Sequence, residues 1–94
     1  ATSVSLAAQL LGRLTSPSNA AIRAETQLKV QEVLNEMDPV DREVLVLRHF
    51  EHLSNAETAE LLDIRKSAAS KRYIQAIRRL KAVLRNTPGF EDRF

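Results

Sequence analysis

Two helical patterns joined by a tight turn occupy residues 54–84, whose sequence is SNAETAELLDIRKSAASKRYIQAIRRLKAVL. Ser54 and Glu57 have the spacing of a capping box, in which a hydroxyl and a carboxylate each accept a hydrogen bond from a free amide at a helix start. The helix that they begin is expected to end near Leu62. Asp63 follows where a sharp turn is needed, because Asp tolerates left-handed backbone better than most residues. This pattern predicts a helix-turn-helix.

The second helix of this pair carries the local charge. Between Ile64 and Phe90 there is no Asp or Glu, whereas residues 25–63 hold ten acids and only three bases. The eight cations of the acid-free stretch are Arg65, Lys66, Lys71, Arg72, Arg78, Arg79, Lys81 and Arg85. Such a surface attracts a polyanion. A helix, a turn and a basic amphipathic helix in that order are typical of proteins that lay one helix in the major groove of DNA.

This basic helix is expected to start between Arg65 and Ser67 and to continue to about Arg85, before Asn86-Thr87-Pro88-Gly89 stops it. Helical spacing assigns one face to the core: Ala69, Tyr73, Ala76, Ile77, Leu80 and Leu84. The opposite side, which we call the reading face, is Ser67, Ser70, Lys71, Ile74, Gln75 and Arg78. Lys and Arg favour guanine, Gln favours adenine, and an apolar side chain suits the thymine methyl group. The reading face is therefore predicted to contact DNA bases.

Two further helices are expected before the capping box. Ser16-Pro17 and Asp38-Pro39 are helix start signals, since each places a capping side chain before a Pro that needs no backbone partner. The first helix should run to about Glu36, and the second over roughly residues 39–51. Their expected core residues are Ile22, Thr26, Val30, Val33 and Met37, then Val40, Val44, Leu45, Leu47 and Phe50.

The predicted fold class is all-α, a small domain of about four helices with a C-terminal helix-turn-helix. We expect a DNA-binding domain of the winged-helix-like kind, with no evident wing. Residues 17–86 are expected to form this domain and residues 87–94 a tail. Residues 1–16 are interpreted as a linker or docking arm with little to pack against.

Length and composition exclude several classes of protein. In a chain of 94 residues, most apolar side chains must serve one core rather than a large catalytic pocket. The absence of Cys rules out disulfides and thiolate metal sites. No apolar run approaches membrane-spanning length, and residues 1–14 lack the basic start of a signal peptide. We therefore expect a cytoplasmic protein, not an enzyme, with no cofactor.

His49 and His52 are the only residues that suggest a metal site. Their spacing can place two imidazoles on one side of a helix, but zinc needs further ligands and none is evident. We expect both to be surface or helix-end histidines, and no metal to bind.

Residues 34–54, LNEMDPVDREVLVLRHFEHLS, resemble region 4.1 of RNA polymerase sigma factors, and residues 55–80 resemble region 4.2. The family is sigma-70, and the compact form is similar to its extracytoplasmic-function (ECF) group. The resemblance covers roughly residues 20–84. It implies that the basic helix binds the minus-35 promoter element as duplex DNA while the domain docks on the flap of the polymerase β subunit. Apolar surface from the first three helices would serve the docking.

The resemblance also assigns positions and partners. The base-reading positions of the family fall on Ser70, Lys71, Ile74 and Gln75. Arg42 and Arg48 fall where the family approaches phosphates, and phosphate contacts are also expected from Lys66, Arg72 and Arg79 of the basic stretch. DNA melting would belong to region 2, from which residues 1–16 would lead. A monomer is expected, and an anti-sigma factor is a further candidate partner.

The sequence departs from the family pattern at three places. Asp63 stands where Gly is usual, Thr58 replaces an aliphatic residue, and Ser70 and Lys71 occur in reversed order. The promoter sequence read by other members therefore cannot be transferred. Two alternatives stay open. A dimeric helix-turn-helix regulator would bind a palindrome, and a helical module that binds only proteins would not bind duplex DNA at moderate salt.

Overall fold

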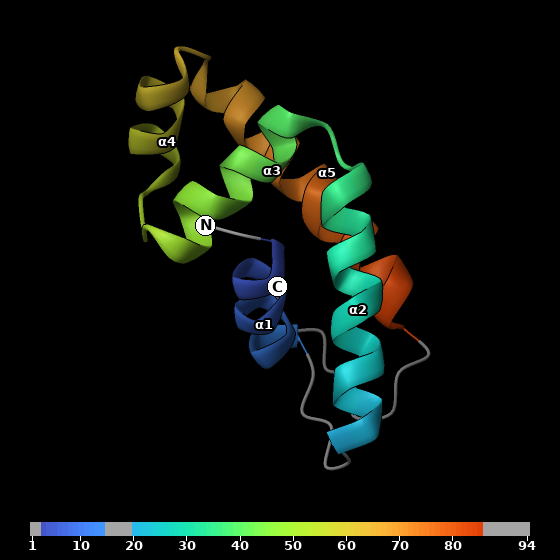
Figure 1. Cartoon of the computed structure of the whole chain (residues 1–94). Coiled ribbons are helices and arrows are strands. Elements are labelled where there is room, and N and C mark those ends of the chain that lie inside the picture. Colours follow the sequence, from blue (N-terminus) through green and yellow to red (C-terminus); the bar gives the residue numbers. More distant parts are fainter. Residues whose placement is uncertain (1–2, 15–19, 86–94) are drawn as a thin grey trace.

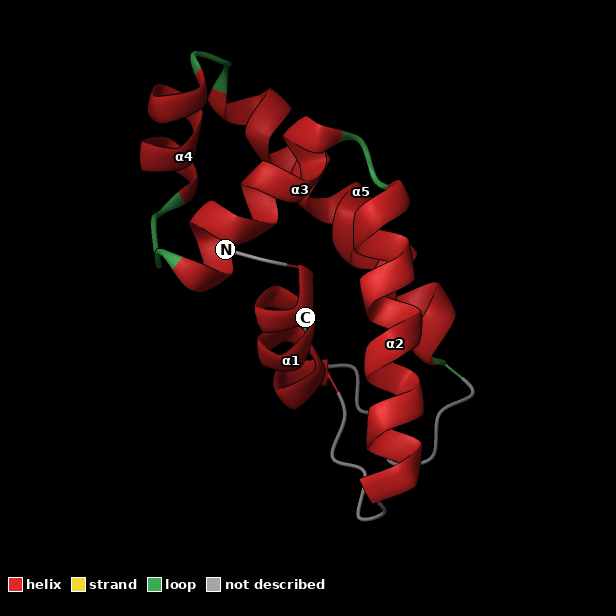
Figure 2. Cartoon of the chain, viewed as in Figure 1, coloured by secondary structure: helices red, strands yellow, loops and turns green. Residues whose placement is uncertain are grey.

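The computed structural model describes residues 3–14 and 20–85, which form an arrangement of helices (Figure 1). The helices are α1 (Ser3–Leu14), α2 (Ala20–Glu36), α3 (Pro39–Leu45), the short π-helix η1 (Val46–Phe50), α4 (Asn55–Leu62) and α5 (Lys66–Leu84). Within these residues there is no strand (Figure 2). The predicted all-α class is confirmed, and so is the helix-turn-helix, which α4 and α5 form. The expected helix start at Ser16-Pro17, the stop at residues 86–89 and the tail lie outside the described residues.

The core lies between α1, α2, the α3–η1 segment and the second half of α5. Its buried members are Leu6, Ala7, Leu10, Leu11, Val30, Leu34, Met37, Leu45, Ala76, Ile77, Leu80 and Leu84. Thr26 is also buried, and its hydroxyl donates to the carbonyl of Ile22 at 2.7 Å, so that this polar group is satisfied. Figure 1 shows α4 at the end of the molecule farthest from the start of α2. The helix-turn-helix therefore projects from the core at one end.

The first helix corrects one expectation. Residues 1–16 were interpreted as a linker with little to pack against, but α1 packs against α2 and η1, and Leu6, Ala7 and Leu10 are fully buried. The physical reason is that Leu6, Leu10 and Leu11 form an apolar stripe, and the other helices leave uncovered apolar side chains that this stripe buries. Whether the segment also connects to another region of a longer protein stays a prediction.

The Asp38-Pro39 start signal is confirmed. The Asp38 carboxylate accepts a hydrogen bond from the amide of Val40 at 2.8 Å, and Pro39 occupies the first turn of α3. The expected helix over residues 39–51 continues from α3 into η1, where the Glu51 amide donates to the carbonyl of Val46, the five-residue spacing of a π-turn.

Two expected core residues of this segment are exposed instead. Val44, Leu45 and Leu47 are buried as predicted, but Val40 and Phe50 are 37% and 38% exposed. Val40 lies in the first turn of α3, at the edge of the packed helices. At the other end, the buried position is taken by His49 rather than by Phe50. The prediction for Val40 and Phe50 is therefore wrong, because a periodic stripe does not reveal where packing stops.

The turn between α4 and α5 has the predicted chemistry. The Glu57 amide donates to Ser54 Oγ at 3.1 Å, and the Ser54 amide donates to Glu57 Oε1 at 3.0 Å, which confirms the capping box. Asp63 has φ 54° and ψ 48°, the predicted left-handed conformation. The amides of Asp63 and Ile64 then donate to carbonyls of the last turn of α4, so that the helix end is satisfied. These contacts fix where α5 starts.

Candidate nucleic-acid interface

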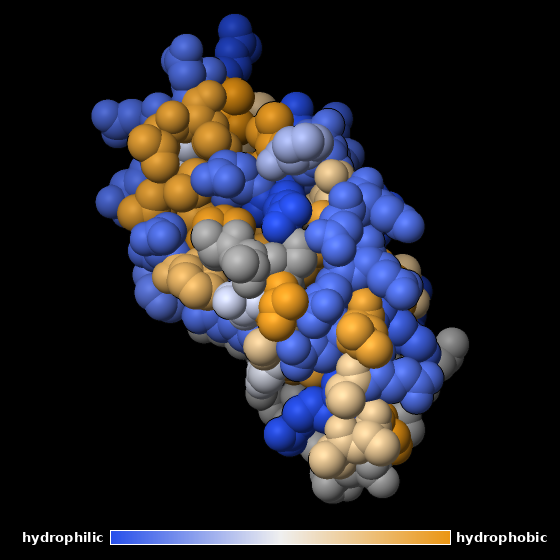
Figure 3. Space-filling model, in the orientation of Figure 1, coloured by the Kyte–Doolittle hydropathy of each residue, from blue (hydrophilic) through white to orange (hydrophobic). Residues whose placement is uncertain are grey.

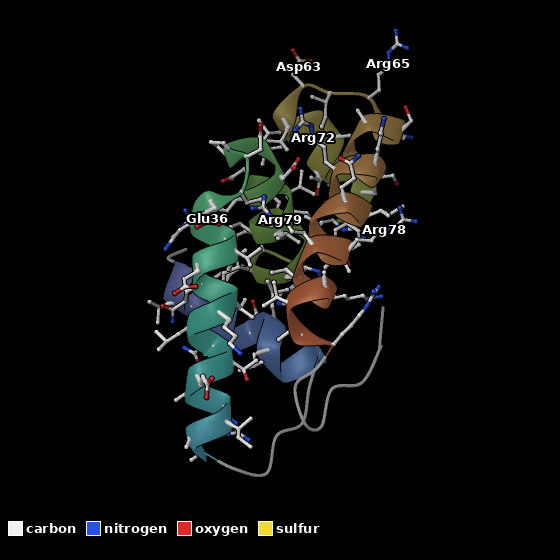
Figure 4. All side chains as sticks on the ribbon, turned by 90° about the vertical axis from the view of Figure 1, so that its right-hand side faces the viewer. Glu36, Asp63, Arg65, Arg72, Arg78 and Arg79 are labelled. Carbon is white, nitrogen blue, oxygen red and sulfur yellow. The ribbon has the colours of Figure 1, made fainter. Side chains whose placement is uncertain are left out.

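Helix α5 has two distinct faces. Ala69, Ala76, Ile77, Leu80 and Leu84 are buried and Tyr73 is half-buried, as predicted. On the reading face Ser67, Lys71, Ile74, Gln75 and Arg78 are exposed and Ser70 is half-buried. Figure 4 shows Arg78 directed away from the rest of the molecule. The structure thus brings the predicted base-reading residues together on one accessible helix side.

The electrostatics of this side follow from the sequence. None of residues 64–85 is an acid, and Arg65 and Lys66 are exposed at the start of the helix, next to Lys71 on the next turn. An exposed face with cations and uncharged hydrogen-bonding side chains can approach phosphates and base edges without burying a carboxylate beside DNA.

The predicted phosphate-binding residues differ in their exposure and in how closely they pair with carboxylates of the protein. Lys66 is exposed at the first position of α5. Arg79 is about half exposed and lies 3.9 Å from Glu36 Oε2, a distance and exposure typical of weak ion pairs. Arg72 is 38% exposed and is paired with a carboxylate of α3, since its Nη1 lies 2.8 Å from Asp41 Oδ1. Figure 4 shows Arg72 and Arg79 directed from α5 toward its neighbours, unlike Arg78.

Arg42 and Arg48 lie on α3 and η1, and both are half-buried. The guanidinium carbon of Arg48 lies 4.3 Å from the centroid of the Tyr73 ring, a cation–π contact with α5. Arg42 lines a groove on another part of the surface. Phosphate contacts by these residues stay predictions.

The environment of His49 was not expected. Instead of lying at the surface, its side chain is buried and stacks on Tyr73, with ring centroids 5.5 Å apart, and its Nε2 lies 3.0 Å from the Tyr73 hydroxyl. His49 does lie in the last turn of η1, so the helix-end position is as expected. The expectation of a surface position is wrong, because α5 supplies a ring and a hydroxyl that match the imidazole. His52 is exposed. In the part of the chain that the structure describes, no group of three His, Cys, Asp or Glu side chains could hold a metal ion.

A second surface feature lies away from the reading face. It is a groove of about 630 Å³ with a mixed polar and apolar lining, which we call the α3–α4 groove, between the end of α2, the α3–η1 segment and α4. Its lining residues are Asn35, Met37, Pro39, Arg42, Glu43, Val46, Leu47, Glu51, Leu53 and Leu61. Leu61 is 64% exposed. Figure 3 shows hydrophobic surface over α4 and the adjoining part of the molecule, at the upper left. Sequence reasoning expected apolar docking surface here but did not identify its residues.

Residues 27–80 match the family described as sigma-70, region 4. The match covers more than half of the chain, and the chain therefore belongs to this family. Region 4 is the part of sigma factors that recognises the minus-35 promoter element, and it is a DNA-binding rather than a catalytic region. Comparisons with curated proteins and with solved structures gave no match. Among the described residues no helix is both long and apolar enough to span a bilayer.

Proposed function

We propose that this domain directs RNA polymerase to promoters by binding the minus-35 element as duplex DNA through α5. The observation that carries the proposal is that the reading face of α5 is accessible and contains no carboxylate, in a chain that belongs to the sigma-70 region 4 family. Lys71 and Arg78 would bond to guanine, Gln75 to adenine, and Ile74 would contact a thymine methyl group. Lys66 and Arg79 would hold phosphates and set the position of the helix in the groove.

The polymerase would dock on the α3–α4 groove through its apolar side chains. Leu61 is a large exposed apolar side chain, and Met37, Leu47 and Leu53 line the same groove. Apolar surface of this kind is typical of a protein-binding site. The flap of the polymerase β subunit is the proposed occupant. The groove also carries Glu43 and Glu51, so we expect a basic residue of the flap beside its apolar contact. Docking and DNA binding would then use separate surfaces of one small domain.

Binding by the isolated domain should be weak, because one small module contacts few phosphates. Polymerase and region 2 would supply the remaining affinity by holding the neighbouring DNA, which raises the effective concentration of the domain at the promoter. We place the chain in the compact ECF group, and we propose that it acts in the cytoplasm as a monomer without a cofactor. An anti-sigma factor would compete for the same α3–α4 groove.

Selection from a pool of random-sequence duplexes at low salt tests the DNA-binding proposal. The expected result is one short asymmetric motif that a Lys71→Ala, Gln75→Ala variant does not enrich. A palindromic motif would instead indicate a dimeric helix-turn-helix regulator. Absence of enrichment by the unchanged chain would contradict sequence-specific binding by this domain.

Docking is tested with a matched pair of variants. Leu61→Lys places a charge in the α3–α4 groove, whereas Leu28→Lys makes the same change at a similarly exposed leucine of α2, outside the groove. We expect only Leu61→Lys to weaken binding to a purified β-flap fragment by about tenfold or more, since the apolar contact of Leu61 is lost and the ammonium must lose water on docking. Equal binding by both variants would place the docking surface elsewhere.

A further inference from the structure

Arg72 is held by carboxylates at the start of α3. Its Nη1 lies 2.8 Å from Asp41 Oδ1, with a hydrogen bond, and 3.6 Å from Asp38 Oδ1. The same oxygen of Asp38 accepts the capping hydrogen bond from Val40. The side chain of Asp41 is only 19% exposed, so this pair is partly shielded from water and from salt. Arg72 thus ties α5 to the first turn of α3.

The next residue of α5 makes a second tie to the same segment. Tyr73 stacks on His49 and lies under Arg48, both of which belong to η1. Arg72 and Tyr73 therefore attach α5 to the two ends of the α3–η1 segment. Lys71 and Ile74 of the reading face flank them directly in the sequence. Because these ties lie on the turn that carries the base-reading residues, they restrict the rotation of α5 at that turn.

We infer that Arg72 is a positioning residue for base reading and not a phosphate contact. This inference rests on the proposed function of α5. If Arg72 moved to a phosphate, the partly buried carboxylate of Asp41 would be left without its partner close to the negatively charged DNA, and leaving a partly desolvated charge unpaired is unfavourable. Arg79 differs in this respect, because Glu36 is well exposed and is rehydrated when Arg79 leaves it. Arg79 is free to exchange partners, whereas Arg72 is not.

Salt dependence and base preference separate the two roles. The probes are the duplex that the unchanged chain enriches from a random pool and an unselected duplex of equal length. The preference is the ratio of the two affinities. The variants are Arg72→Gln, Asp41→Asn and their combination, with Arg79→Gln as the control for a phosphate contact.

A positioning role predicts that Arg72→Gln and Asp41→Asn each lower the preference by about fivefold, the upper range for a single ion pair. The combined variant should lose no more than either single variant, since both break one pair. For Arg72→Gln, the affinity deficit relative to the unchanged chain should not vary with salt. For Arg79→Gln, the preference should stay unchanged and the deficit should shrink by about 3.5-fold between roughly 50 and 200 mM salt, as expected for one lost phosphate contact.

The inference is overturned if Arg72→Gln behaves like Arg79→Gln, or if Asp41→Asn keeps the full preference. Circular dichroism verifies that each variant folds, and Asp41→Asn, which preserves side-chain volume, decides the question if Arg72→Gln does not fold. Failure of the proposed function is a distinct result, because the unchanged chain would then enrich no sequence, and the inference would be rejected with it.

Discussion

Replacing Leu10 by Ala tests whether α1 belongs to the folded domain. Leu10 is fully buried in a core cluster to which α2 and α5 also contribute. Truncating a buried leucine costs the transfer free energy of the lost methyl and methylene groups and leaves a cavity, about 3 kcal/mol in total. In a domain of this size, each 1 kcal/mol lowers Tm by roughly 4–8 °C. We therefore expect Leu10→Ala to lower Tm by more than about 10 °C.

The assay is thermal unfolding followed by far-ultraviolet circular dichroism, with Val4→Ala as the matched control. Val4 lies on the same helix but is 55% exposed, so its truncation should change the free energy of unfolding by no more than about 0.5 kcal/mol. An unchanged Tm for Leu10→Ala would mean that α1 does not share the cooperative core. The expectation that residues 1–16 form a linker or docking arm with little to pack against would then hold.

Three other changes test local features. Thr58 is fully buried and its hydroxyl has no hydrogen-bond partner, so Thr58→Val should raise the free energy of unfolding by about 1 kcal/mol in urea denaturation; a loss of stability would refute the account of this hydroxyl. Tyr73→Phe keeps the ring but removes the hydrogen bond to His49, and should cost about 1 kcal/mol in the same measurement; no cost would show that this bond adds nothing. The pKa of Glu57 lies below its ordinary value of 4.5. The main cause is a hydrogen bond from the backbone amide of Ser54, and a hydrogen bond with the Ser54 side chain adds to it. The stabilisation by this carboxylate is therefore complete above the ordinary pKa and is lost as the pH falls through the lower folded-state value. Glu57→Gln should remove that part of the acid-unfolding curve, and an unaltered curve would count against the capping role.

The features predicted correctly from the sequence are those that neighbouring residues decide. Ser54 and Glu57 bond to each other within one helical turn, and Asp38 caps the helix that begins beside it. Asp63 adopts the left-handed conformation because Asp tolerates this backbone geometry, a property of that residue alone. Helical periodicity likewise separated the buried side of α5 from its reading face. These signals act over a few residues, so the fold class and the exposed helix could be predicted without knowledge of the packing.

The features that the sequence did not reveal are contacts between distant residues. Arg72 pairs with Asp41, which lies 31 residues away, and His49 meets Tyr73 at a separation of 24 residues. Both depend on how the α3–η1 segment packs against α5, and a charge or an aromatic ring in the sequence does not identify its partner. Arg72 was expected at a phosphate because it lies in a basic stretch. The apolar stripe on α1 is visible in the sequence, but its burial was not predicted, because only the packed helices show what covers it.

Cross-linking from a single position tests most directly whether α5 lies in the DNA groove. The chain contains no Cys, so Gln75→Cys introduces one site that a photoreactive thiol reagent labels selectively. Leu28→Cys on α2, also exposed, is the control. We predict that the label at position 75 cross-links to bases within the motif enriched by the unchanged chain, whereas the label at position 28 does not. Cross-links of equal yield from both positions, or none from position 75 on a duplex that the labelled chain binds, would contradict the assignment of α5 as the DNA-reading helix.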